Sequence, residues 1–272
     1  TWHSAPDGGA CFATDDGGWV YTSNSEMRSN AGGVGALRFN AGAEVIDAYS
    51  ILRRTSINCA GGPTPWGSWL SCEEFARGQV YECDPMGVKP AVVRPALGSF
   101  RHEAVTVDTK NQCLYLTEDL PNGGFYRFRP ANGLPDLTQG TLEIASVVQN
   151  QGQYFVLWRP VPDPLAKQTS TFSQVPDAFG FRGAEGIALH DGKAYFTTKH
   201  DNRVWTYDID SQQLEVIYDV ATSANPILSG VDNVVITPAG DVLVAEDGGN
   251  MQLVVLTPAN KIIPILQIIG HE

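Results

Sequence analysis

The sequence of 272 residues is poor in cysteine, in basic residues and in long apolar runs. Its five cysteines are too few and too scattered for a disulfide framework, and their odd number leaves at least one thiol unpaired within the chain. Lysine and arginine total 18 against 30 acidic residues, a net charge of −12, which argues against nucleic acid or an anionic membrane as partner. No apolar run approaches the roughly 18 residues of a membrane span.

Helix patterns are also nearly absent. Short alternating runs rich in Val, Ile, Tyr, Phe and Trp are separated by Gly, Asp, Asn and Pro turns, which is typical of strands and hairpins. Three parts of the chain repeat one order of three strands, each opened by a carboxylate: 103–128, 185–207 and 232–256. The leading carboxylates of these repeats are Glu103, Glu185 and Asp232.

Two further copies of the repeat are looser. One carries Cys59 where the leading carboxylate should be, with strands predicted at 69–74 and 79–83. The other lies at the amino end, with strands predicted at 19–24 and 35–39. The separation along the sequence between Glu103 and Glu185 is longer than that between the other consecutive leading residues. This predicts an insertion from about Pro130 to Phe181.

Repeats of this size with three or four short strands predict the blades of a β-propeller. We therefore expect an all-β protein, a single β-propeller domain over residues 1–272 with five visible blades. The chain starts abruptly at Thr1 and stops at Glu272 after a strand-like run. We expect it to be truncated at both ends, so a sixth blade could belong to the full-length protein. The alternative is a β-sandwich, which would not show a fixed acidic position in each repeat.

Equivalent positions of propeller blades converge on the central channel. We therefore expect a ring of one thiolate and three carboxylates formed by Cys59, Glu103, Glu185 and Asp232. A second set of acids ends the neighbouring strands and should lie on one rim, with either member of each pair as a candidate: Glu73 or Glu74, Glu118 or Asp119, and Glu246 or Asp247. As metal ligands of this second set we take the first of each pair, namely Glu73, Glu118 and Glu246.

Carboxylates crowded in a dry channel cannot all stay ionised without a cation. Hard divalent ions such as calcium suit the oxygen ligands, and a more thiophilic metal such as iron suits Cys59. Three cationic groups stand near channel-facing positions and are our candidates for contacts to a substrate: Arg182, Lys199 and His200.

The block from Asn58 to Glu74, NCAGGPTPWGSWLSCEE, together with the motifs 100–103 and 115–119, resembles PhoX-type alkaline phosphatases. The resemblance implies a β-propeller that holds an iron pair and several calcium ions and hydrolyses phosphate esters outside the cytoplasm, in the periplasm or after secretion. It also implies that Cys59, Glu103 and Glu185 are iron ligands, while the remaining rim acids share calcium.

The chain departs from this family pattern at two places. Gly183 stands where an arginine is expected two residues before Glu185, with Arg182 one place further back, and the part of the pattern that should follow Glu272 is missing. The predicted function is metal-dependent hydrolysis of a small phosphate monoester by a monomer. Two alternatives stay open: a calcium-dependent lactonase-like propeller, which needs no thiol, and a non-catalytic binding propeller stabilised by calcium.

Overall fold

The computed structural model describes residues 2–270, which form an all-β protein of antiparallel sheets. The first sheet contains β1 (Pro6–Ala13), β2 (Trp19–Ser25), β3 (Gly32–Phe39) and β4 (Val45–Thr55). The second contains β5 (Asn58–Pro63), β6 (Trp69–Glu73), β7 (Val80–Cys83) and β8 (Val92–Val93). The last contains β18 (Val231–Ile236), β19 (Val242–Glu246), β20 (Gln252–Leu256) and β21 (Ile262–Gln267).

A nine-stranded sheet lies between these and divides into two further groups of four strands. The third group contains β9 (His102–Asp108), β10 (Cys113–Glu118), β11 (Phe125–Pro130) and β12 (Gly140–Asn150). The fourth contains β14 (Ala184–His190), β15 (Lys193–Thr198), β16 (Arg203–Asp208) and β17 (Gln213–Asp219). Strand β13 (Gln153–Pro160) pairs with both β12 and β17 and so joins the two groups at their outer edges.

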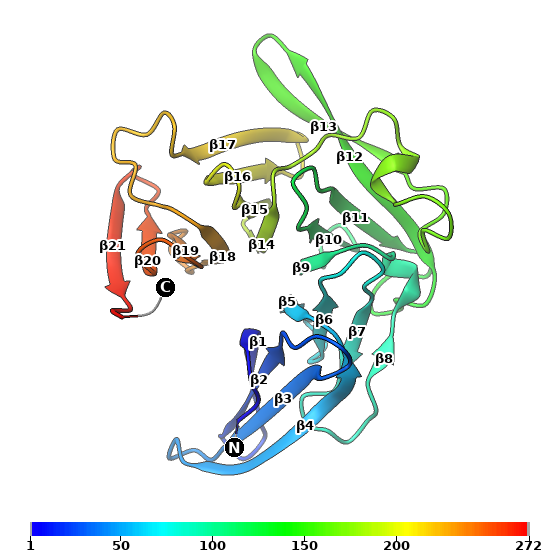
Figure 1. The fold of residues 1–272 in the computed structure, drawn as a ribbon, viewed down its shortest axis with the longest axis vertical. Helices are drawn as coiled ribbons and strands as arrows, with labels where there is room; N and C mark the ends of the chain where they lie inside the picture. The colour runs from blue at the N-terminus through cyan, green and yellow to red at the C-terminus, as the bar shows by residue number, and fades with distance from the viewer. Residues whose placement is uncertain (1, 271–272) are drawn as a thin grey trace.

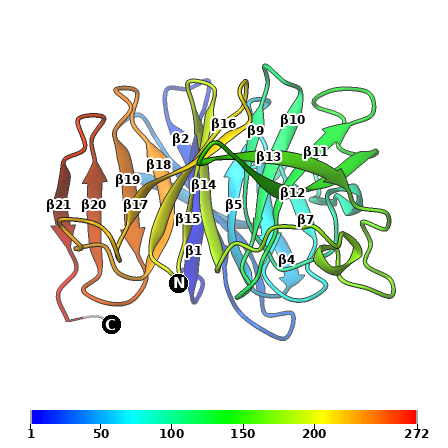
Figure 2. The ribbon, with the colours of Figure 1, turned by 90° about the horizontal axis from the view of Figure 1, so that it is seen from above.

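The five groups are arranged radially around one centre (Figure 1). Strands β1, β5, β9, β14 and β18, the first of each group, lie innermost, and consecutive ones contact each other. Seen from the side, the groups form an open arc one layer deep whose strands run across its thickness (Figure 2). As a result, the start of every innermost strand comes to the same end of the central space.

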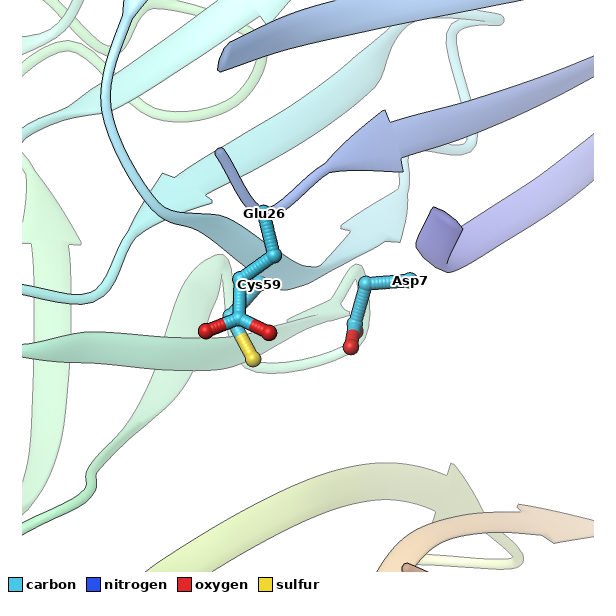
Figure 3. A group of neighbouring side chains, drawn as sticks. All are labelled: Asp7, Glu26 and Cys59. Atoms are coloured by element: carbon cyan, nitrogen blue, oxygen red, sulfur yellow. The ribbon is translucent and has the colours of Figure 1, made fainter. Parts of the chain in front are cut away.

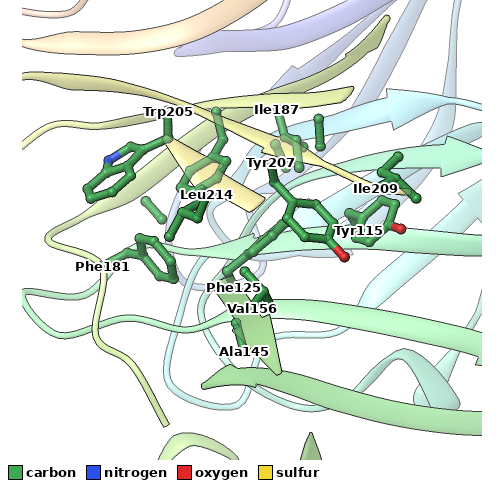
Figure 4. Close-up of a cluster of buried hydrophobic side chains, with 14 of the residues drawn as sticks. Tyr115, Phe125, Ala145, Val156, Phe181, Ile187, Trp205, Tyr207, Ile209 and Leu214 are labelled. Carbon is green, nitrogen blue, oxygen red and sulfur yellow. The ribbon is translucent and has the colours of Figure 1, made fainter. Parts of the chain in front are cut away.

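Apolar side chains fill the space between consecutive groups. The largest cluster joins the third and fourth groups and includes Tyr115, Phe125, Phe181, Trp205 and Tyr207 (Figure 4). Separate buried clusters join the first to the second group, the second to the third and the fourth to the fifth. The second, third and fourth groups therefore pack against a neighbour on each side, whereas the first and the fifth each share one such cluster.

Several strands were missing from the sequence prediction. Each group has a fourth strand, and the predicted insertion at 130–181 contains two of the strands, β12 and β13. The first strand of the amino-terminal group, β1, was also missed. The only helices within residues 2–270 are the 3₁₀ segments η1 (Pro95–Leu97) and η2 (Phe172–Gln174), and no helix there is long and apolar enough to cross a membrane. All five cysteines are free thiols.

Candidate metal centre

The second residue of every innermost strand lies at the same end of the central space. Sequence analysis identified four of these positions, and the structure brings their side chains together: Cys59, Glu103, Glu185 and Asp232. The fifth is Asp7, the second residue of β1, which sequence reasoning missed. Because strands alternate their side chains with a period of two, one shared register directs all five toward the centre.

These side chains, with two others, form three overlapping groups in which the candidate ligand atoms all lie within 4.8 Å of one another. The first group is Asp7, Glu26 and Cys59, whose side chains converge in Figure 3. The other two groups are Cys59–Glu74–Glu103 and Glu103–Glu185–Asp232. Cys59 and Glu103 each belong to two groups, and the Cys59 thiol donates to Glu103 Oε1 across 3.4 Å.

A second ring of side chains comes from the residue that directly follows each second strand. After β2, β6, β10, β15 and β19 these residues are Glu26, Glu74, Asp119, Lys199 and Asp247. Sequence analysis takes Glu73, Glu118 and Glu246 as the metal ligands of the three acidic pairs. Of the six residues in these pairs, the structure includes only Glu74 in a ligand group.

Those three glutamates end their strands and bind local backbone. Glu73 accepts from the amides of Ser56 (3.0 Å) and Gln79 (3.2 Å). Glu246 accepts from the amides of Ser229 (2.6 Å) and Gln252 (2.9 Å).

Glu118 makes the same kind of contact in the third group. It accepts from the Gly124 amide (2.8 Å) and from the Tyr126 hydroxyl (2.9 Å). None of the three glutamates belongs to a ligand group, and each ties the end of its strand to a neighbouring turn.

Backbone carbonyl groups at the leading residues accept hydrogen bonds from side chains of the preceding group. Asn24 donates to the carbonyl oxygens of Cys59 (2.8 Å) and Ala60 (2.6 Å). Thr117 donates to the Glu185 carbonyl across 2.6 Å, and Thr197 donates in the same way to the Asp232 carbonyl. Asn24, Thr117 and Thr197 each stand one residue before the last residue of a second strand, so the fold positions its leading side chains by a repeated contact.

Burial makes the charged forms of these groups costly. Desolvation, followed by the neighbouring charge of Asp232, raises the pKa of Glu185 to about 10. Desolvation raises the pKa of Glu74 to about 7 and that of Asp7 to about 6. The pKa of Glu103 is also raised well above its usual value, first by burial and then by the charge of Glu185. A multivalent cation would relieve this repulsion without protonating the carboxyl groups.

The donor set fits such cations. Glu103 Oε2 and Asp119 Oδ1 are buried and have no hydrogen-bond partner among the described residues. Carboxylate oxygens suit calcium, and the adjacent Cys59 sulfur adds a soft ligand that suits iron. Burial and the charge of Glu103 raise the pKa of Cys59 well above its usual value in the metal-free protein, so a metal bound there would displace the thiol proton.

Two cationic side chains reach this centre, and only one of them was predicted to contact a substrate. Lys199 Nζ lies 3.0 Å from Asp232 and 2.6 Å from Asp247. Arg101, which the sequence analysis did not select, pairs with Glu74 and lies 3.7 Å from Asp119.

The other two predicted cations are exposed. The side chains of Arg182 and His200 make no hydrogen bond or ion pair within residues 2–270. The His200 ring packs beside Gly183.

The family model for alkaline phosphatase PhoX matches residues 16–82 and 76–204, which together cover more than half of the chain. The chain belongs to the PhoX alkaline phosphatase family. The matched part includes Cys59, Glu74, Glu103 and Glu185, whereas Asp7 and Asp232 lie outside it. No curated protein matches the sequence.

Solved structures with a similar fold exist. One from Bacteroides uniformis ATCC 8492, described as a 6-phosphogluconolactonase, has a TM-score of 0.52 and 12% identity, and the match covers 93% of this PhoX-family chain and 82% of that protein. A second, from Bacteroides fragilis NCTC 9343 and described in the same way, has a TM-score of 0.51 and 12% identity, with 95% and 83% covered. At this identity the likeness concerns the fold alone.

Proposed function

We propose that this PhoX-family protein is a metal-dependent phosphate monoester hydrolase. The observation that carries the proposal is the set of three ligand groups that share Cys59 and Glu103 at one end of the central space. A cluster of several adjacent cations is suited to a phosphate, which carries several anionic oxygens. Family membership supports phosphate-ester chemistry and, with it, the use of metals.

We propose further that the five groups are the blades of a β-propeller. Their radial order, their four-stranded antiparallel make-up and the contact between consecutive innermost strands support this architecture (Figure 1). The repeated leading positions then have a simple role, since each blade contributes one ligand to a common axis.

In this proposal iron is held by Cys59, Glu103 and Glu185, and calcium by the remaining acids of the two rings. When bound, these ions would supply positive charge for the phosphoryl oxygens and the leaving group. The protein's own residues hold and orient the site. Burial of Glu103 and Glu185 excludes water from the inner side, and the Thr117 and Thr197 hydroxyls fix the backbone of the leading residues.

Lys199 has a separate role in binding the substrate. Its ammonium group stands between Asp232 and Asp247 and is partly exposed, so it can donate to a phosphate oxygen at the mouth of the centre. We expect the substrate to be a small phosphorylated molecule, and the protein to act as a monomer in the periplasm or after secretion.

The deciding experiment measures metal content and phosphatase rate on one sample purified without chelator. We expect iron and calcium by inductively coupled plasma mass spectrometry and hydrolysis of p-nitrophenyl phosphate. The Cys59→Ser variant should lose most of the iron and the rate, whereas Cys11→Ser, which removes an exposed thiol, should keep both. Absence of both metals from the active protein would refute the proposal.

A second candidate function is a calcium-dependent lactonase, which the fold similarity to proteins described as 6-phosphogluconolactonases favours. In that case a lactone substrate would be hydrolysed, p-nitrophenyl phosphate would not, and Cys59→Ser would stay active. The third candidate, a binding propeller, would contain calcium and turn over neither a lactone nor a mono- or diester of phosphate.

A further inference from the structure

Arg101 lies at the rim of the centre and is not among the cationic residues that the sequence predicted to contact a substrate. It lies between η1 and β9, and its backbone forms an isolated bridge with Glu74 at the end of β6. The guanidinium pairs with the Glu74 carboxylate and lies 3.7 Å from Asp119, while 35% of the side chain stays exposed. Its Nε is buried and has no hydrogen-bond partner among the described residues.

The partner of Arg101 is itself a candidate metal ligand. Glu74 shares a ligand group with Cys59 and Glu103, so an ion bound by that group competes with Arg101 for the Glu74 oxygens. The Glu74 side chain is only 9% exposed, so its carboxylate can release Arg101 only where another cation takes its place, and an ion in this ligand group would be that cation. Metal binding would leave the guanidinium beside a new positive centre, where an anion is favoured.

We propose that Arg101 is the guanidinium that contacts the phosphate at this centre, and that metal binding frees it from Glu74. A guanidinium presents a planar fork of donors that matches two oxygens of one phosphate. Arg101 precedes Glu103 by two residues, and its guanidinium reaches two acids of the second ring, Glu74 and Asp119. The inference rests on the proposed metal centre and favours esters with a terminal phosphate, whose oxygens are free to accept two hydrogen bonds.

Metal and phosphate binding should then be coupled. If metal binding releases Arg101 to the anion, bound phosphate must strengthen metal binding by the same factor. In the metal-free protein Arg101 stays with Glu74, so replacing it should hardly change phosphate affinity. The contribution of Arg101 should therefore appear only in metal-loaded protein.

The test measures inorganic phosphate binding by isothermal titration calorimetry on Arg101→Gln, with and without iron and calcium, and metal content on the same samples. Arg203→Gln is the matched control, because Arg203 is also 35% exposed and also pairs with two carboxylates, Asp201 and Asp219, away from the ligand groups. We expect phosphate affinity of metal-loaded Arg101→Gln to fall by about 10- to 100-fold, the effect of one charged hydrogen bond, with metal content unchanged. Arg101→Lys should recover part of the loss, and Arg203→Gln should bind phosphate normally.

Two results would overturn the inference. Equal phosphate affinity of loaded Arg101→Gln and the unmodified protein would show that Arg101 does not contact the anion. Loss of metal from Arg101→Gln would show that it supports the metal site instead. The proposed function fails separately: if the unmodified protein binds phosphate through Arg101 but hydrolyses no ester, the inference stands and the hydrolase does not.

Discussion

Replacement of Thr117 by valine tests whether each group positions the leading residue of the next. Thr117 is fully buried at the end of β10, and its hydroxyl makes three contacts with backbone, of which the one with the Ala104 carbonyl is the longest at 3.5 Å. It donates to the Glu185 carbonyl across 2.6 Å and accepts from the Ala104 amide across 3.1 Å. The ladder between β9 and β10 is irregular at this point, so the amide of Ala104 relies on the hydroxyl.

The expected cost follows from the two shorter contacts. Valine has nearly the same shape, so the substitution leaves no cavity and removes only the hydroxyl. The substitution leaves one buried carbonyl and one buried amide without a hydrogen-bond partner, and each such group costs about 1–3 kcal/mol of stability. We expect Thr117→Val to lower the free energy of unfolding by roughly 2–6 kcal/mol, and to weaken iron binding because Glu185, a proposed iron ligand, loses its anchor.

The assay is urea unfolding of the metal-free protein followed by tryptophan fluorescence, with the iron content of the folded, metal-loaded protein measured by inductively coupled plasma mass spectrometry. Thr206→Val is the matched control: Thr206 is also buried in a strand, but its hydroxyl makes no hydrogen bond within residues 2–270. We expect Thr206→Val to change stability by less than ~0.5 kcal/mol. If the two variants unfold at the same urea concentration and bind iron equally, the positioning argument is wrong.

Three further predictions follow from the same structure. Asn24→Ala should lower the free energy of unfolding by about 3 kcal/mol or more in urea, because it leaves the part-buried Cys59 carbonyl and the buried Ala60 carbonyl without their hydrogen-bond donor, whereas Asn132→Ala on the surface should not. Phe125→Ala should cost about 3–5 kcal/mol in the cluster between the third and fourth groups, and Tyr154→Ala, 47% exposed, much less. Metal-free protein should lose thermal stability as pH rises from about 5 toward 9, since the raised pKa of Glu185 (about 10) and of Glu74 (about 7) stabilises the fold only while they are protonated. Added iron and calcium should raise the melting temperature more at pH 8 than at pH 5, and an equal shift at both would contradict this.

Much of the candidate site was predictable because it is repeated. Glu103, Glu185 and Asp232 each open a similar strand pattern, and Cys59 takes the same place in a looser copy. A repeated position in a radial fold must recur around the axis, so the sequence pattern predicted their convergence without any distance. The same argument could not find Asp7, because Pro6-Asp7-Gly8-Gly9 has the composition of a turn and little β propensity.

The sequence could not decide which residue of each acidic pair faces the centre. Whether Glu73 or Glu74 reaches the centre depends on which residue ends β6, and strand ends cannot be located to one residue from propensity. One residue decides the outcome, since neighbouring side chains leave a strand in opposite directions. Arg101 was hidden for a related reason: it lies in irregular chain before β9, and its link to Glu74 is a contact between different groups.

The two rings place more negative charge in one space than their own cations can balance. They contain eight carboxyl groups, from Asp7, Glu26, Glu74, Glu103, Asp119, Glu185, Asp232 and Asp247, whereas Lys199 and Arg101 are the cations paired with them among the described residues. Full ionisation would leave six charges unbalanced, which three divalent ions could neutralise. Protons are the alternative, and the raised pKa values of the buried members show that they would bind. Metals and protons must therefore compete for this centre, and the metals gain as pH rises.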